Sequence, residues 1–252
     1  MAVHTFETMG TVVSIRLDDV VDEVTQRAAI TEVEAVFADL NNRFSLYLPN
    51  SEASLIARGE MALTEASAEM RDAYAESLAW RDATAGAFTP HRPDGVIDLS
   101  GTIKAAGIRA ATEVLDGRDL HTFSVNVGGD IMTRGVPSDG AWITGIAHPL
   151  VPGELVSVIS LTPEWPAVAT SGTAERGEHI WRRPDTDTSF IQATVVATDI
   201  MTADVLATAL ISGGQDTLAA VTARGDVGVL IVKANGELLA NEAYMGVVTP
   251  SG

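Results

Sequence analysis

Short apolar runs separated by turn residues fill much of the second half of the chain, and this pattern constrains the fold most. Five runs rich in β-branched residues are typical of strands, namely FSVNVGG, AWITGIA, LVSVISL, AVATS and FIQATVVA, all between Phe123 and Ala197. Two helices, Met201–Ser212 and Gln215–Ala223, and a strand over residues 227–232 are expected to follow. Helices are expected to dominate the first half, so the sequence predicts an α+β fold.

The first half shows apolar residues at helical spacing after one early strand. Residues 11–17 (TVVSIRL) are expected to form that strand, and an amphipathic helix is expected over residues 22–42. Ser51 is a candidate N-cap for a short helix, and Thr64 for a longer one over residues 65–84. Residues 96–117 predict a strand followed by a helix. With no repeat and no low-complexity linker, we expect a single domain over residues 1–252.

Composition excludes several classes of protein. The chain has 252 residues, of which 46% are apolar and 20% charged, and this is an ordinary globular balance. The net charge of −18 makes nucleic acid and anionic membranes poor partners. The chain has no cysteine, so disulfides and thiolate metal sites are excluded. Without a visible secretory signal or an apolar stretch of transmembrane length, a cytoplasmic protein with no membrane span is expected.

Asp204 and Thr208 lie four residues apart at the start of a predicted apolar helix. Side chains at this spacing share one helical face, and the start of a helix offers free N–H groups that favour anions. Such a pair can hold a hard divalent cation together with phosphate oxygens, as Mg²⁺ is usually bound. The alternative is an acid that complements the helix dipole beside a packed threonine.

The segment DLSGTIK, residues 98–104, is a second candidate for chemistry. Asp98 is expected to end a strand, Gly101 permits close approach of the backbone, and Lys104 is expected in the first turn of a helix. A lysine there opposes the helix dipole, and a bound phosphate would compensate for that cost. The alternative is a solvated lysine beside a capping aspartate.

Three further segments carry weaker signals. Gly128 and Gly129 after a strand indicate a tight turn or a close backbone approach. His179 follows the polar turn at residues 170–172, and histidine is a ready proton acceptor near neutral pH, although a lone histidine is more often structural. Met9 and Tyr47 could flank a flat ring, although core packing is the stronger interpretation for either one alone.

In this order the segments resemble the FAD:protein FMN transferase (ApbE) family over about residues 6–214. The matching motifs are TMGT at 8–11, FSLYLPNSE at 44–52, GAF at 86–88, DLSGTIK at 98–104, VNVGGDI at 125–131, ATSG at 169–172, HI at 179–180 and ADVLATA at 203–209. The resemblance implies a mixed, mostly antiparallel sheet with flanking helices. It also implies Mg²⁺-dependent transfer of the FMN half of FAD to a threonine or serine hydroxyl of an acceptor protein, with release of AMP.

Residue roles follow from the resemblance alone. The metal ligands would be the carbonyl of Gly101, the side chains of Asp204 and Thr208, and the backbone of Ala207. His179 would be the base that acts on the incoming hydroxyl. FAD would contact Met9, Tyr47, Ala87, Phe88, Thr89, Asp98, Lys104, Ile180 and Trp181.

The chain also departs from the family pattern. The aspartate usual after GAF is replaced by Thr89-Pro90, the aspartate of the H-I-x-D-P stretch is absent, and Ala207 stands where some members have an aspartate. Two other functions therefore stay open. One is an FAD pyrophosphatase that forms FMN and AMP with water as the acceptor, and the other is a flavin-binding carrier without turnover.

Overall fold

A computed structural model describes residues 2–172 and 189–249 of the chain. Its centre is an eight-stranded sheet in the order β1-β2-β3-β4-β7-β8-β9-β10, and every ladder within the described residues is antiparallel. The strands are β1 (Ala2–Thr8), β2 (Thr11–Leu17), β3 (Phe123–Val127), β4 (Asp130–Arg134), β7 (Ala167–Gly172), β8 (Phe190–Ala197), β9 (Gly228–Lys233) and β10 (Leu238–Ala240). The predicted α+β fold with a mostly antiparallel sheet is confirmed.

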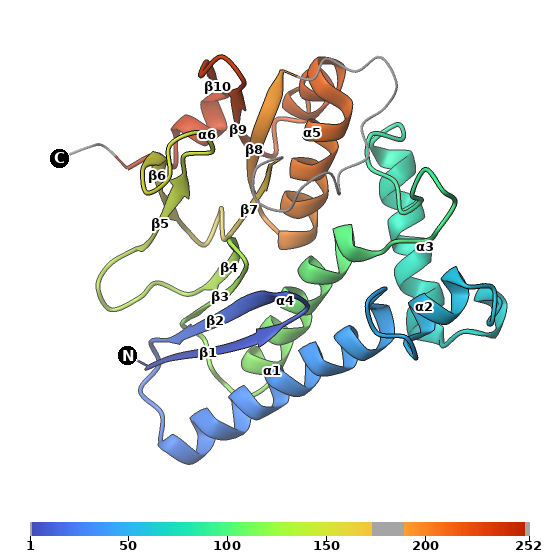
Figure 1. Cartoon of the computed structure of the whole chain (residues 1–252). Helices are drawn as coiled ribbons and strands as arrows, with labels where there is room; N and C mark the ends of the chain where they lie inside the picture. The colour runs from blue at the N-terminus through green and yellow to red at the C-terminus, as the bar shows by residue number, and fades with distance from the viewer. Residues whose placement is uncertain (1, 173–188, 250–252) are drawn as a thin grey trace.

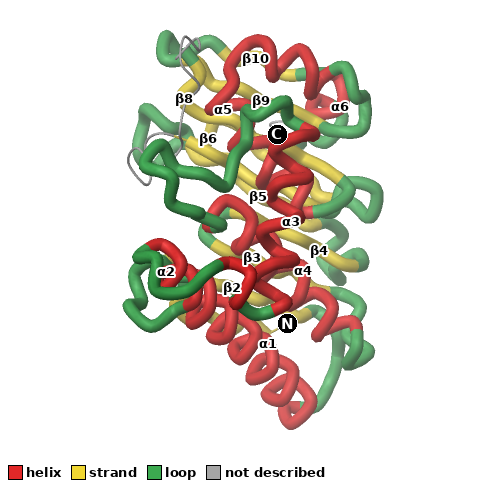
Figure 2. The backbone as a smooth tube through the Cα atoms, turned by 90° about the vertical axis from the view of Figure 1, so that its right-hand side faces the viewer, coloured by secondary structure: helices red, strands yellow, loops and turns green. Residues whose placement is uncertain are grey.

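Helices cover one face of this sheet (Figures 1 and 2). Helix α1 (Glu23–Phe44) packs on α4 (Ser100–Asp116), α4 packs on α5 (Ile200–Thr222), and α5 lies against β7 and β8. Their apolar side chains join those of the strands in one buried cluster that runs from Val13 to Ile231. Asp22 caps α1 by accepting hydrogen bonds from the N–H groups of Val24 and Thr25. The layer therefore rests on burial of one face of each helix.

Helix α5 joins the two helices expected from the sequence across a kink. Gly214 has φ of 63° within the helix, a conformation that glycine adopts without steric cost. Fifteen residues of α5 are buried, so α5 is the most apolar helix of the helix-side core. Among the described residues, no helix is both long and apolar enough to cross a membrane.

A smaller layer covers the opposite face of the sheet. The hairpin of β5 (Trp142–Ala147) and β6 (Leu155–Leu161), with the short helix α6 (Glu242–Met245), buries a second cluster against Val168, Val196 and Leu230. Val168 lies in this cluster, while Ala167 and Ala169 lie in the helix-side cluster. Strand β7 therefore contributes alternate residues to the two faces.

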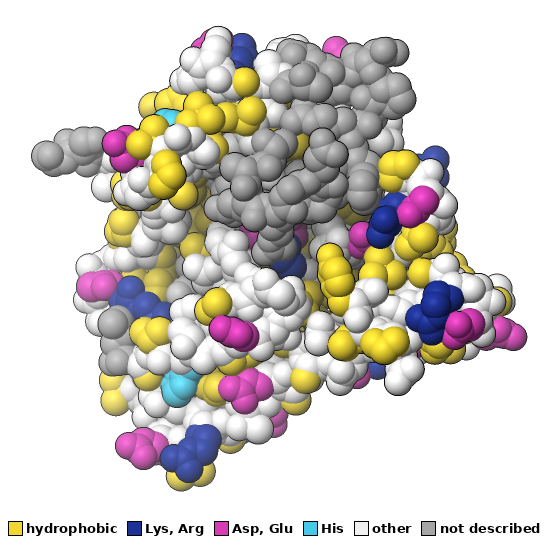
Figure 3. All heavy atoms as spheres, in the orientation of Figure 1, with side chains coloured by type: hydrophobic (Ala, Val, Ile, Leu, Met, Phe, Trp, Pro, Cys, Tyr) yellow, Lys and Arg dark blue, Asp and Glu magenta, His cyan; other side chains and the backbone are white. Residues whose placement is uncertain are grey.

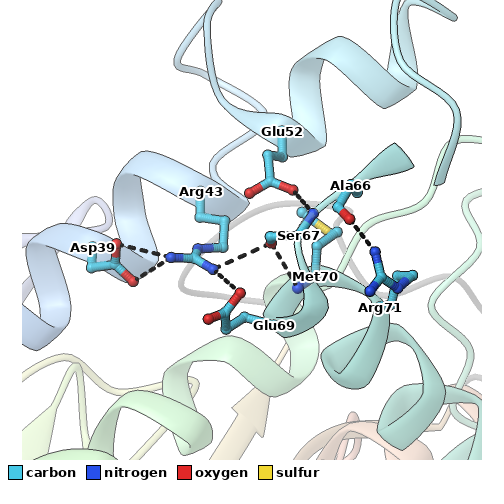
Figure 4. A network of polar contacts seen from close by, with 8 residues as sticks. All are labelled: Asp39, Arg43, Glu52, Ala66, Ser67, Glu69, Met70 and Arg71. Atoms are coloured by element: carbon cyan, nitrogen blue, oxygen red, sulfur yellow. Dashed lines mark hydrogen bonds and ion pairs between the residues drawn. The ribbon is translucent and has the colours of Figure 1, made fainter. Parts of the chain in front are cut away.

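A third cluster lies beneath α2 (Glu52–Ala57), the 3₁₀ turn Leu63–Glu65 and α3 (Ala68–Ala83). Ser51 caps α2 as predicted, but Thr64 does not cap α3. Ser67 is the cap instead, and its hydroxyl accepts hydrogen bonds from the Met70 N–H and from Arg43 (Figure 4). Arg43 also pairs with Asp39 and Glu69, so this network ties the end of α1 to the start of α3.

The expected strand before α4 is not formed. Residues 96–98 belong to a loop in which Ile97 makes an isolated bridge to His91, and the N–H of Asp98 donates to the carbonyl of Pro90. The prediction of a strand there was wrong because the loop folds back on itself, so no sheet neighbour is available to it.

Candidate functional site

Two pairs of polar side chains, Lys104 with Asp130 and Ser171 with Thr208, join the helix layer to the sheet. They lie where α4 and α5 pack on β4 and β7 (Figure 1). We call this group the interlayer site, and it consists of Lys104, Asp130, Ser171, Asp204 and Thr208. Most of the surrounding side chains are apolar and buried. A polar group held in such surroundings needs charged or hydrogen-bonding partners, so the group is a candidate for binding chemistry.

Helix α5 contributes a polar stripe to its otherwise apolar wall. Asp204 is 3% exposed, Thr208 is partly buried one turn later, and Ser212 is 2% exposed after one further turn. The hydroxyl of Thr208 lies 3.0 Å from the hydroxyl of Ser171 on β7. The stripe therefore faces the sheet and is held there by a contact between the two layers.

The expectation that Asp204 meets free N–H groups at a helix start was wrong. Helix α5 begins at Ile200, and Asp199 caps it by accepting a hydrogen bond from the Thr202 N–H at 2.9 Å. Asp204 is the fifth residue of the helix, where the N–H groups already have partners within the helix. Asp204 therefore lies within α5, and only its side chain can bind a ligand.

Lys104 reaches across from α4 to the sheet. It is the fifth residue of α4 and so lies just beyond the first turn in which it was expected. Its ammonium forms an ion pair with the carboxylate of Asp130 on β4. Asp130 is 1% exposed, and its other oxygen accepts a hydrogen bond from the Thr170 N–H at 3.2 Å. The alternative of a solvated lysine is therefore excluded by the ion pair and by a side chain that is only 16% exposed.

The GAF segment connects the starting turn of α4 with α5. A Cβ added at Gly101 would lie 2.9 Å from the ring of Phe88, and one added at Gly213 would lie 2.8 Å from the Cβ of Ala87. Ala87 and Phe88 are 1% and 3% exposed, so core packing accounts for their side chains. Ala87 and Phe88 therefore pack closely against both the first turn of α4, at Gly101, and helix α5, at Gly213.

Asp98, just before α4, and Thr89, just after Phe88, each make a local hydrogen bond. The Asp98 carboxylate accepts from the Ser100 N–H at 3.0 Å, but the N-cap of α4 is Leu99, so the alternative of Asp98 as the capping residue is not confirmed. The Thr89 hydroxyl accepts from the His91 N–H at 3.2 Å. Both side chains are partly exposed, so a ligand could still reach them.

Met9 and Tyr47 lie at different distances from the core. Met9 and Gly10 form the turn between β1 and β2 with φ of 51° and 68°, and Met9 packs between the helix-side cluster and the cluster beneath α2. A positive φ is costly for a methionine and marks the turn as a place where backbone geometry matters. Tyr47 is 96% exposed on the loop before α2. The remaining predicted residues, His179, Ile180 and Trp181, lie outside the described residues.

The interlayer site and its neighbouring backbone offer a small number of oxygen ligands for a hard divalent cation. The described residues hold no cluster of three or more histidine, cysteine, aspartate or glutamate side chains that could bind a metal by itself. Asp204 and Thr208 offer a carboxylate and a hydroxyl, while the carbonyls of Gly101 and Ala207 lie inside helices, where one lone pair accepts the helical N–H. This small number of protein oxygens is compatible with Mg²⁺, because Mg²⁺ is commonly held by one or two carboxylates together with substrate phosphates.

Asp130 and Ser171 belong to the site but were not selected from the sequence. Both lie on strands whose alternation places them on the helix-covered face, two residues from Met132 and Ala169 of the buried cluster. A polar residue on the apolar face of a strand is the signal that could have revealed them.

One face of the molecule mixes both signs of charge. Figure 3 shows acidic and basic side chains interspersed on one face, and many of them form ion pairs, such as Arg58 with Glu60. An interspersed surface with a net charge of −18 gives little attraction for a polyanion.

Comparisons with known proteins place this geometry in a family context. The model of the ApbE family matches residues 9–92 and 89–231. An FAD:protein FMN transferase from Haemophilus influenzae is 24% identical over 294 residues, covering 90% of this chain and 84% of the relative. Another from Vibrio cholerae is 30% identical over 153 residues, covering 56% of this chain and 45% of the relative.

Solved structures show the same fold. The crystal structure of the ApbE protein from Thermotoga maritima has a TM-score of 0.80 at 18% identity and covers 99% of both chains. The flavin transferase ApbE from Vibrio cholerae has a TM-score of 0.77 at 22% identity and covers 98% of both chains. The likeness extends over almost the whole chain, including the elements that hold the interlayer site.

Proposed function

Because the chain belongs to the ApbE family, we propose that it transfers the FMN half of FAD to a threonine or serine hydroxyl of an acceptor protein and releases AMP. One observation carries the proposal beyond the family match. The interlayer site places an ammonium, two buried carboxylates and two hydroxyls within an apolar layer. That combination suits a diphosphate with a hard cation.

The proposed reaction replaces the phosphoanhydride bond between the two halves of FAD with a phosphoester bond to the acceptor. The acceptor hydroxyl oxygen forms a bond to the phosphorus on the FMN side of FAD, and the bond from that phosphorus to the bridging oxygen breaks. AMP leaves with the bridging oxygen, and the proton of the hydroxyl passes to a base. A diphosphate is stable in water, so catalysis requires stabilisation of charge and alignment of the attacking oxygen.

The described residues supply charge and placement for this step. Lys104 provides a positive charge at the layer boundary, where low polarity strengthens its attraction to phosphate oxygens. Asp204 and Thr208, with the carbonyls of Gly101 and Ala207, would hold Mg²⁺. Bound there, Mg²⁺ would supply a Lewis acid that neutralises phosphate charge. The buried wall of α5 keeps bulk water from these groups.

Recognition of the flavin is proposed on the family resemblance. Met9 at the β1–β2 turn and the exposed Tyr47 offer a thioether and an aromatic ring that suit a flat ring system. Thr89 and Asp98 offer partly exposed polar groups near the start of α4. His179 is proposed as the base, with Ile180 and Trp181 as further flavin contacts.

Incubation with FAD, Mg²⁺ and an acceptor peptide with a D-x-x-[ST]-G-A-[ST]-like site tests this proposal. Transfer predicts a covalently bound, fluorescent flavin on the peptide together with AMP. AMP without labelled peptide would identify an FAD pyrophosphatase and contradict the proposal. Bound flavin without AMP or label would identify a carrier, and would also contradict it.

A further inference from the structure

The carboxylate of Asp130 connects three elements through its two oxygens. One oxygen pairs with the Lys104 ammonium from α4, and the other accepts the Thr170 N–H from β7 at 3.2 Å. Asp130 itself begins β4 and is 1% exposed. A carboxylate buried this deeply would be costly without such partners.

The sheet is opened locally at this position. Strands β4 and β7 pair at Ile131↔Val168 and Met132↔Ala167, and the ladder goes no further toward Gly129. The Thr170 N–H would reach the β4 backbone if the ladder continued, but it donates to the Asp130 side chain instead. Gly128 and Gly129, with φ of 60° and 98°, turn the chain from β3 into β4 just before this point. The Asp130 side chain thus takes the place of a ladder bond at this end of β4.

The position of the Lys104 ammonium depends on this arrangement. A lysine has four rotatable bonds and loses considerable entropy when it is held in one place. Asp130 is fixed by the backbone of two strands, so it can hold the ammonium toward the opened seam. Ser171 follows Thr170 directly on β7 and contacts Thr208, so the ammonium and the α5 stripe lie beside the same strand end.

We propose that Asp130 is a positioning residue that fixes the Lys104 ammonium for the FAD diphosphate. The inference rests on the proposed function, since it assigns the means by which that site binds its substrate. The ion pair joins the two side chains, so FAD binding should depend on both residues together.

The structure offers a matched control for this pair. Arg134 and Asp116 form a second ion pair between the same two elements, β4 and α4, at 3.3 Å. Both side chains of this pair are about 40% exposed, and Asp116 is the last residue of α4, far along the helix from Lys104. Asp116→Asn therefore breaks an α4–β4 ion pair without touching the interlayer site.

The experiment measures FAD affinity by quenching of flavin fluorescence in Asp130→Asn, Lys104→Met, the double variant and Asp116→Asn. We expect Asp130→Asn and Lys104→Met each to weaken FAD binding about tenfold, as for the loss of a hydrogen bond to a charged group. The double variant should bind like Lys104→Met alone, and Asp116→Asn like the unmodified protein. Additive losses in the double variant, or an equal loss in Asp116→Asn, would overturn the proposal.

A conservative variant separates positioning from a merely structural role. Asp130→Glu keeps the negative charge but displaces the ammonium with which Asp130 pairs. It should weaken FAD binding when Lys104 is present and weaken it no further in the Lys104→Met background. Unweakened FAD binding by Asp130→Glu, or an equal loss in the Lys104→Met background, would contradict the proposal. If Asp130→Asn does not fold, this variant takes its place.

The outcomes distinguish this inference from the proposed function. FAD binding with the expected coupling but no transfer to any acceptor would support the role of Asp130 and reject the transferase. Transfer with no coupling between Asp130 and Lys104 would support the transferase and reject the role of Asp130. Failure of the unmodified protein to bind FAD would reject both.

Discussion

The hydroxyls of Ser171 on β7 and Thr208 on α5 lie 3.0 Å apart, although 37 residues separate them in the chain. This contact fixes the orientation of a threonine on the helix wall from the neighbouring strand. Partners that orient metal-binding side chains commonly affect metal affinity strongly. The contact therefore bears directly on how α5 would present oxygen atoms to a cation.

Ser171→Ala tests this orientation. We expect the Mg²⁺ concentration for half-maximal AMP release to rise about tenfold, because the Thr208 hydroxyl loses the group that holds it. Thr170→Val is the matched control, since Thr170 makes a similar hydroxyl contact of 2.9 Å to Thr194 on the other face of the sheet. The control should lower the free energy of unfolding by about 1 kcal/mol and leave the Mg²⁺ dependence unchanged. Equal Mg²⁺ dependence in both variants would contradict the role of Ser171.

Asp204→Asn removes the negative charge from α5 while keeping the size of the side chain. We expect AMP release to fall at least about 100-fold, because loss of charge stabilisation in a buried site is costly to the rate. Mg²⁺ binding, measured by calorimetry, should be lost as well. Asp216→Asn, an exposed aspartate on the same helix, is the control and should behave like the unmodified protein. Full activity of Asp204→Asn would remove this residue from the site.

Gly107→Ala tests the packing of the helix layer. A Cβ at this position would lie 2.6 Å from Cε1 of Phe37, whose ring is completely buried. We expect a loss of about 1–3 kcal/mol in the free energy of unfolding, reduced by up to about 1 kcal/mol because alanine favours the helix. Phe37→Leu in the same chain should recover part of that loss in a denaturant titration. If Gly107→Ala alone were more stable than the unmodified protein, α1 and α4 would not be packed this closely.

Tyr244 links stability to alkaline pH. Burial raises the pKa of its hydroxyl, and a nearby hydroxyl, that of Ser157, opposes the shift. The hydroxyl has no hydrogen bond of normal geometry within the described residues. Because the folded state favours the protonated form, stability from this group is present below the ordinary pKa of about 10 and decreases as the pH rises above it.

Thermal unfolding of Tyr244→Phe between pH 8 and pH 11 checks this linkage (from about two units below to about one unit above the ordinary tyrosine pKa). The variant should lose less stability over this interval than the unmodified protein. Tyr47→Phe, which changes a tyrosine that is 96% exposed, should lose as much as the unmodified protein. The same loss in all three proteins would assign the alkaline transition to other groups.

Much of the fold followed from local signals in the sequence. Five of the strands between Phe123 and Ala197 were found because their β-branched runs are bounded by turn residues, and Ser51 caps its helix as expected. Strand β4 was missed because Asp130 and Arg134 at its two ends interrupt the apolar pattern. The cap of α3 was misplaced by three residues because two possible caps, Thr64 and Ser67, precede that helix.

The site was only partly predictable, for a physical reason. Lys104 and Thr208 were selected because of their places on helices, yet their partners Asp130 and Ser171 come from strands 26 and 37 residues away. Such contacts depend on how the layers pack, and local periodicity carries no information on packing between distant elements. The resemblance to a family supplied the reaction, whereas the structure supplied the partners that hold the side chains in place.

The most direct measurement compares the amount of AMP released with the amount of flavin bound covalently to the acceptor in one reaction. Transfer from FAD predicts equal molar amounts of the two at every time point, and neither product in the absence of acceptor. AMP that accumulates without bound flavin, at a rate independent of the acceptor, would contradict the transfer of FMN to a protein hydroxyl.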